Sequence, residues 1–299
     1  MNFPISGQHI NPVYLIVVGF VIGVFGGFFG VGGSFLAGPA LFIAGMPMNF
    51  VVGTDLAHIV GKSIAAARKH QTLGNVDMKL AWIMVIGTVI GSELGAQGIQ
   101  MLKRTGKVDF TVGITFVVVL IAVSLFMAWE TLRTLRSQAG KPKRPPRKDF
   151  SAFGYVSKAL QRIHLPPTVD LPTSGIRKIS FWIILLVSFV GGLFSGFLGG
   201  GAGYIRMPLM VYLLGVPTHV AVGTDLFEVM ISASYGTFSH AMKGNVDIMV
   251  ALVMHTGAAV GAQIGVAGTQ YFSGPKIRLA FIPLPLIGAG LIIYRLLTM

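Results

Sequence analysis

Two acidic residues stand in the same five-residue motif, VGTDL, which occurs at residues 52–56 and again at 222–226. Both copies lie in stretches that are otherwise apolar, so Asp55 and Asp225 are candidates for burial inside a membrane. An ionisable group in a membrane segment is costly unless it is paired or hydrated, and it is treated as functional by default. The repeated aspartate therefore marks a candidate site for ion or proton chemistry.

Further polar residues follow each aspartate at helical spacing. On a helix that turns ~100° per residue, Asp55, His58 and Lys62 share one face. Asp225 and Glu228 occupy the matching face of the second copy. His58 and Glu228 could carry a coupling proton, since imidazole titrates near neutral pH; structural hydrogen bonding is the alternative.

The two halves carry their cationic residues on different segments. The first half has Lys62 on the helix itself, whereas the second has Arg206, at a position where the first half has Ala37. We expect Lys62 and Arg206 to enter one cavity from opposite halves, which would suit an anion. Asp55 and Asp225 either serve that site or neutralise the two cations. We also expect Arg206→Ala to weaken anion binding more than it disturbs folding.

Glycine-rich breaks precede the repeated motif in both halves. The segments GVGGS and GGGAG are each followed by a short apolar block. A helix that restarts there presents free backbone N–H groups and the positive end of its dipole, where small oxyanions bind well. Close helix packing through glycine is the alternative. The candidate ligands at the breaks are Gly30, Gly32, Gly33, Ser34, Gly199, Gly200, Gly201 and Gly203.

Thr54 and Thr224 precede the two aspartates and complete the candidate substrate site. Their Gly-Thr-Asp sequence is also typical of a helix cap, so a structural role stays open. His70 and His240 end the same stretches, where we expect solvated or helix-terminal positions rather than contact with a ligand. No HExxH motif, G-x-S-x-G motif or phosphate-binding loop occurs, so we expect no catalytic residue, metal or cofactor.

The elements that position these residues must be membrane helices. Of 299 residues, 53% are hydrophobic and only 11% are charged, and the apolar residues fall in long blocks. The blocks run at about 12–30, 35–46, 50–67, 80–99, 110–129, 179–198, 204–215, 219–239, 248–268 and 279–297. The second block of each half is too short for the ~20 residues that cross a bilayer. The first two blocks of each half either cross fully or form a re-entrant hairpin.

The ten blocks form two repeats of five. GGFFGVGG in the first half corresponds to SGFLGGGA in the second, and HQTLGNVD corresponds to HAMKGNVD. Short, glycine-interrupted segments at corresponding positions of two halves point to the binding site of a transporter. We predict an all-α integral membrane protein of two inverted repeats, at residues 1–130 and 179–299, joined by a basic linker at 131–178.

Charge sets the orientation. The net charge is +13, and residues 131–180 hold eleven of the 23 basic residues with only two acidic ones. The positive-inside rule places this linker in the cytoplasm and the N-terminus in the periplasm. The linker lacks the aromatic platforms of a nucleic-acid site, so we expect anionic lipid as its partner and no nucleic acid. Residues 150–165 predict either a helix on the inner membrane surface or an irregular segment.

The paired motifs GFFGVGGSFLAGP and GFLGGGAGYIRMP are each followed by VGTDL and then by H…GNVD. In these motifs the sequence resembles the sulfite exporter TauE/SafE family of membrane permeases, and the likeness covers nearly the whole chain outside the linker. The resemblance implies a transporter of small sulfur oxyanions and organosulfonates, such as sulfite, sulfoacetate or toluene sulfonate, in the bacterial inner membrane. It also implies that both glycine breaks, with Pro39 and Pro208, and both Gly-Thr-Asp motifs are family positions.

Residues and resemblance together predict an anion transporter that works by alternating access at a midplane site, with or without coupling to an ion or proton. A channel would share the fold but show no flux ceiling. A membrane-embedded sensor or scaffold would act through the basic linker and tolerate the loss of Lys62 or Arg206. A membrane enzyme would need a nucleophile or a metal cluster. The anion, the direction of transport and the oligomeric state stay open, and a homo-oligomer is compatible with the sequence.

Overall fold

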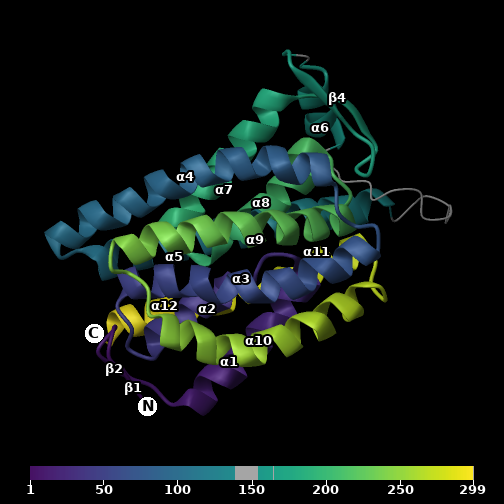
Figure 1. Cartoon of the computed structure of the whole chain (residues 1–299). Helices are drawn as coiled ribbons and strands as arrows, with labels where there is room; N and C mark the ends of the chain where they lie inside the picture. Colours follow the sequence, from purple (N-terminus) through teal and green to yellow (C-terminus); the bar gives the residue numbers. More distant parts are fainter. Residues whose placement is uncertain (139–153, 164, 299) are drawn as a thin grey trace.

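A computed structural model describes residues 1–138, 154–163 and 165–298, which are mostly helical (Figure 1). The first half contains β1 (Asn2–Phe3), β2 (Gln8–His9), α1 (Pro12–Phe29), α2 (Ser34–Ile43), α3 (Met48–Thr72), α4 (Met78–Thr105) and α5 (Val108–Gln138). Between the halves lie α6 (Gly154–Gln161), β3 (Thr168–Leu171) and β4 (Ile176–Ser180). The second half contains α7 (Phe181–Leu198), the 3-10 turn η1 (Gly200–Ala202), α8 (Gly203–Leu209), the π-helix η2 (Met210–Leu214), α9 (Thr218–Met242), α10 (Ile248–Thr269), α11 (Gly274–Phe281) and α12 (Pro283–Leu297).

Seven helical segments of the described chain are long and apolar enough to cross a membrane. They are Pro12–Phe29, Met48–Thr72, Met78–Thr105, Val108–Arg133, Phe181–Leu198, Ile248–Thr269 and Gly274–Leu297. The last of these joins α11 and α12, which divide at Pro283 because proline cannot continue the hydrogen-bonding pattern of a helix. The predicted class of a multi-pass helical membrane protein is confirmed.

Long helices of one half pack on those of the other through glycine. A methyl group added at Gly23 of α1 would lie 2.8 Å from Cα of Ala258 in α10. One added at Gly192 of α7 would lie 2.6 Å from Cα of Thr88 in α4. Glycine at these positions therefore brings two backbones closer than any side chain would allow, which is how helices associate in lipid.

Both chain ends lie at one end of the bundle, and α6 and β4 lie at the other (Figure 1). We call these ends the terminal face and the linker face. The α1–α2 pair returns to the terminal face, where a methyl group on Gly45 would lie 3.3 Å from Oε1 of Gln8. The α7–η2 segment returns to the linker face, where Nε2 of Gln161 donates a hydrogen bond to the Leu214 carbonyl at 2.7 Å. Both short blocks therefore belong to helical hairpins that begin and end at the same end of the bundle.

Two β-hairpins that the sequence did not predict connect the halves. In the β1–β2 turn, the Ser6 hydroxyl donates to Oδ2 of Asp247 at 2.7 Å. In the β3–β4 turn, the Ser174 hydroxyl donates to Oδ2 of Asp77 at 2.7 Å. The Oδ1 atoms of the same aspartates accept from the first backbone N–H groups of α10 and α4. Each hairpin thus supports the N-cap of a helix in the opposite half.

The linker differs from its prediction in two respects. Helix α5 extends to Gln138, past the expected end of the first repeat at residue 130. Of the two alternatives for residues 150–165, the structure has a helix, α6, at Gly154–Gln161, and its place on the inner membrane surface stays a prediction. Residues 150–153 and 164 lie outside the described part of the chain.

Candidate functional site

The glycine breaks of the two halves meet inside the bundle. Six of their glycines adopt the left-handed conformation that other residues rarely enter, namely Gly30, Gly32, Gly33, Gly199, Gly200 and Gly201. A methyl group on Gly32 would lie 3.4 Å from the Gly200 carbonyl oxygen, and one on Gly203 would lie 2.7 Å from Cα of Val31. The helix restarts at Ser34 in the first half and at Gly203 in the second, as predicted.

Each break also packs against the VGTDL helix of the opposite half. A methyl group on Gly30 would lie 2.5 Å from Cα of Val222 in α9. One on Gly199 would lie 2.9 Å from Cα of Val52 in α3. The repeated motifs of the sequence are therefore neighbours in space, and any side chain at these glycines would separate them.

The first half places its charged residues in a row along α3. Nζ of Lys62 lies 3.3 Å from Nε2 of His58, and Nδ1 of His58 lies 3.3 Å from Oδ1 of Asp55. An ammonium can only donate, so Nε2 accepts and the proton of a neutral His58 is on Nδ1, facing Asp55. The three residues are at most 2% exposed. Among the described residues, no carboxylate oxygen lies within 4.0 Å of Nζ of Lys62.

The second half holds its cation between two acids. Nε of Arg206 donates to Oδ1 of Asp225 at 2.8 Å, and Nη1 lies 2.7 Å from Oε2 of Glu228. All three side chains are fully buried. The stem of Arg206 lies against Gly191 of α7, where a larger residue would collide with its Cγ atom. At the positions equivalent to Gly191 and Arg206, the first half has Ile22 and the smaller Ala37.

The two cations do not contact each other in the described structure. Lys62 is bound by its own helix and Arg206 by α9, so the expectation that they share one cavity stays a prediction. Tyr204 links the two sets, because it belongs to α8 of the second half and lies within electrostatic range of Asp55. Its hydroxyl is fully buried and makes no hydrogen bond. The charged side chains of both sets are at most 2% exposed.

Thr54 and Thr224 have matching structural contacts. Oγ1 of Thr54 accepts a hydrogen bond from the backbone N–H of Asp247 at 2.9 Å, and Oγ1 of Thr224 accepts one from Asp77 at 2.9 Å. Each bond joins a VGTDL helix to the loop before α10 or α4 in the opposite half. A role of these threonines in binding substrate stays a prediction, whereas their role in joining the halves is part of the fold.

Of the two positions expected for His70 and His240, the helix-terminal one is confirmed, since they lie in the last turns of α3 and α9, and the solvated one is wrong. Both are fully buried. Nε2 of His240 donates to the Gly196 carbonyl at 2.9 Å, and Nε2 of His70 lies 3.5 Å from the Gly27 carbonyl. These carbonyls belong to the last turns of α7 and α1, directly before the glycine breaks. Each histidine therefore joins a VGTDL helix to the helix end at the glycine break of its own half.

Comparison with known proteins decides the family. Residues 15–292 match the family described as sulfite exporter TauE/SafE. The chain belongs to that family. The "probable membrane transporter protein YunE" of Bacillus subtilis (strain 168) is 27% identical over 299 residues, which cover 94% of this chain and 97% of the relative. A "probable membrane transporter protein" of Methanocaldococcus jannaschii is 24% identical over 280 residues and 89% of each chain. No solved structure matches significantly.

Membership of the TauE/SafE family makes this protein a membrane transporter, as the sequence motifs indicated. Sequence reasoning missed two residues beside its charged row. Tyr204 stands where the first repeat has Phe35, and His255 of α10, whose ring packs against Gly61, stands where it has Val85. In both cases a polar residue replaces an apolar one between repeats, and that difference was the signal to look for.

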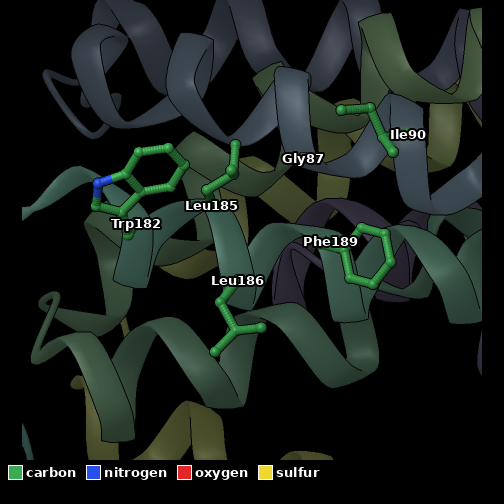
Figure 2. A pocket seen from close by; sticks show the side chains of 6 residues that line it. All are labelled: Gly87, Ile90, Trp182, Leu185, Leu186 and Phe189. Carbon is green, nitrogen blue, oxygen red and sulfur yellow. The ribbon is translucent and has the colours of Figure 1, made fainter.

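A cleft of about 240 Å³ opens on the outer surface of this TauE/SafE member, between α4 and α7 (Figure 2). Its lining is formed by Gly87, Ile90, Trp182, Leu185, Leu186 and Phe189. Three of these side chains are more than half exposed, as expected for a surface that contacts lipid acyl chains. The cleft contains no charged residue, so it does not suit an anion.

Proposed function

We propose that the protein transports a small sulfur-containing anion, such as sulfite, sulfoacetate or a related organosulfonate, across the bacterial inner membrane. The observation that carries this proposal is the buried ammonium of Lys62, which has His58 as its partner and no carboxylate within 4.0 Å among the described residues. A buried cation without a counter-ion is unfavourable. A bound anion beside Lys62 would supply the missing negative charge.

The glycine breaks complete the proposed binding site. Helix α2 starts at Ser34 after a left-handed Gly33 that provides no side-chain cap, and we take its first backbone N–H groups as ligands of the anion. Oxyanions bind such groups, because the N-terminal end of a helix is positive. The remaining proposed ligands come from the breaks and the two charged sets: Gly30, Gly32, Gly199, Gly200, Gly201, Gly203, Thr54, Asp55, His58, Arg206, Thr224, Asp225 and Glu228.

Transport would proceed by alternating access of two inverted repeats about this site. Reciprocal contacts support the inversion, because the same residue types join the halves at both faces: Ser6 with Asp247, and Ser174 with Asp77. The burial of the charged row supports a closed state between outward-open and inward-open forms. The basic linker argues for a cytoplasmic linker face and a periplasmic terminal face.

Tracer flux into proteoliposomes tests the proposal, with sulfite, thiosulfate, sulfate, sulfoacetate and isethionate (2-hydroxyethanesulfonate) as substrates. We expect saturable flux of at least one sulfur anion and competition by the others that fit. Flux that rises linearly without saturation would indicate a channel. Folded protein that moves none of the five anions would contradict the proposal and favour a sensor that acts through the basic linker.

A further inference from the structure

The two repeats have residues of different chemical type at equivalent positions of the site. His58 of the first half corresponds to Glu228 of the second, and the cation is a lysine in one and an arginine in the other. Arginine does not release its proton in proteins, whereas lysine, histidine and a carboxyl without a cationic partner exchange theirs. The second half therefore has a permanent cation, and the first half consists of groups that titrate.

The three carboxylates also differ in their contacts: Asp225 and Glu228 are paired with the permanent cation, whereas Asp55 is not. Asp225 and Glu228 both lie within 2.8 Å of a guanidinium nitrogen of Arg206. Oδ1 of Asp55 lies 3.3 Å from Nδ1 of His58, and its Oδ2 atom is buried without a hydrogen-bond partner. A proton on Oδ2 of Asp55 would therefore break no ion pair, whereas a proton on either of the other two acids would weaken one.

Charge counting indicates that such a proton is needed. Lys62 and Arg206 supply two positive charges, while Asp55, Asp225 and Glu228 supply three negative ones, so the ionised site has one excess negative charge. Adding a monovalent anion would leave two excess negative charges in a space where no side chain is more than 2% exposed. Uncompensated charge of that kind is strongly unfavourable. One proton per anion restores the charge of the empty site.

We infer that the first repeat binds one proton, on Oδ2 of Asp55, together with each monovalent anion, while the second repeat keeps a fixed charge. This inference rests on the proposed anion transport. The step forms one O–H bond, converts the carboxylate to a neutral acid and takes its proton from water on the open side. The groups that face Asp55 and His58 are Lys62 on α3, Tyr204 on α8 and His255 on α10. Transport would then move no net charge.

Isethionate is a suitable probe, because it is monovalent and its sulfonate stays ionised across the working pH range. Proteoliposomes receive a pH step of one unit, acid outside, with membrane potential clamped to zero by potassium and valinomycin. Internal isethionate and an entrapped pH dye are followed together. We expect wild-type protein to accumulate isethionate about tenfold, since one pH unit corresponds to a tenfold ratio for one proton per anion. A clamped potential of either sign should leave this ratio unchanged.

Asp55→Asn and the matched second-half variant Glu228→Gln locate the proton. The Asp55→Asn substitution supplies a permanently neutral amide, so the accumulation ratio should fall to about one and flux should respond to membrane potential. Glu228→Gln should keep the tenfold ratio, whatever its rate. Saturable wild-type flux without proton movement would overturn this inference alone, as would loss of accumulation in Glu228→Gln but not in Asp55→Asn. Folded wild-type protein with no saturable flux would overturn the proposed function and this inference with it.

Discussion

Arg206 is held by two buried acids, Asp225 and Glu228, and this arrangement changes the expected effect of removing it. From the sequence we expected the loss of Arg206 to weaken anion binding more than it disturbs folding, as for a lone cation on the site. A cation that neutralises two buried carboxylates is needed for folding, because its loss leaves both without compensation in a medium that solvates charge poorly. Lys62 is the contrasting case, since no acid within 4.0 Å among the described residues depends on it.

Arg206→Gln should therefore lower the free energy of unfolding by about 3–5 kcal/mol, a cost typical of breaking a buried ion pair. The triple variant Arg206→Gln, Asp225→Asn, Glu228→Gln should recover most of that loss, because it leaves no unpaired charge. Thermal unfolding of the purified proteins in detergent measures both. Equal unfolding temperatures for wild type and Arg206→Gln would show that the ion pairs contribute little to folding.

At the residue scale, the sequence predicted the row Asp55, His58, Lys62, because helical spacing alone places these side chains on one face. The hydrogen-bond distances of 3.3 Å along that row confirm it. The pairing of Arg206 with Asp225 was one of the two alternatives given for that aspartate, whereas its pairing with Glu228 and the proximity of Tyr204 to Asp55 could not be predicted. Those contacts join different helices, and their geometry depends on how the breaks fold.

The elements of each half are interrupted at the same place, and a histidine far away in sequence lies against the helix end before each break. The breaks themselves were readable as glycine runs between apolar blocks. The helix-end positions of His70 and His240 were predicted, but their burial against the Gly27 and Gly196 carbonyls was not, because solvent is the usual neighbour of a helix end. Both β-hairpins were also missed, since strands of two to five residues leave no periodic signal.

Glycine at the α4–α7 contact gives a test at the scale of elements. A methyl group on Gly91 of α4 would lie 2.6 Å from the backbone nitrogen of Leu193 in α7. Gly91→Ala should therefore lower the free energy of unfolding by about 1–3 kcal/mol, as overpacking does. Gly290→Ala in α12, where a methyl group meets nothing within 4 Å, should instead raise it by about 0.5–1 kcal/mol. Similar unfolding temperatures for the two variants would contradict the packing argument.

The two halves of the molecule hold each other together, because elements of each half pack on, or hydrogen-bond to, elements of the other. Helix α1 packs on α10, α7 packs on α4, and each hairpin supports a cap in the opposite half. The sequence repeat predicted that the two halves have equivalent elements, but it could not predict that elements of each half pack against the other half. These contacts bring the glycine breaks of the two halves together inside the bundle, where the proposed alternating access would operate.

The absence of cysteine from the sequence allows a direct test of topology. Gln71 and Ala241 are equivalent exposed positions at the ends of α3 and α9. In intact cells, a membrane-impermeant maleimide added outside should label Ala241→Cys but not Gln71→Cys; in inside-out vesicles the pattern should reverse. Labelling of both variants from the same side would contradict the proposed inversion of the two repeats.

The central claim is that an anion binds beside the ammonium of Lys62, which has no carboxylate within 4.0 Å among the described residues. The concentration dependence of sulfite flux tests this claim most directly. Wild-type protein, Lys62→Met and the control Gly290→Ala would be compared in proteoliposomes at equal protein content. The account predicts that Lys62→Met raises the half-saturating sulfite concentration by about 10- to 100-fold, the value of a charge-assisted hydrogen bond, while Gly290→Ala matches wild type. Unchanged saturation in folded Lys62→Met would contradict the account and place the anion elsewhere.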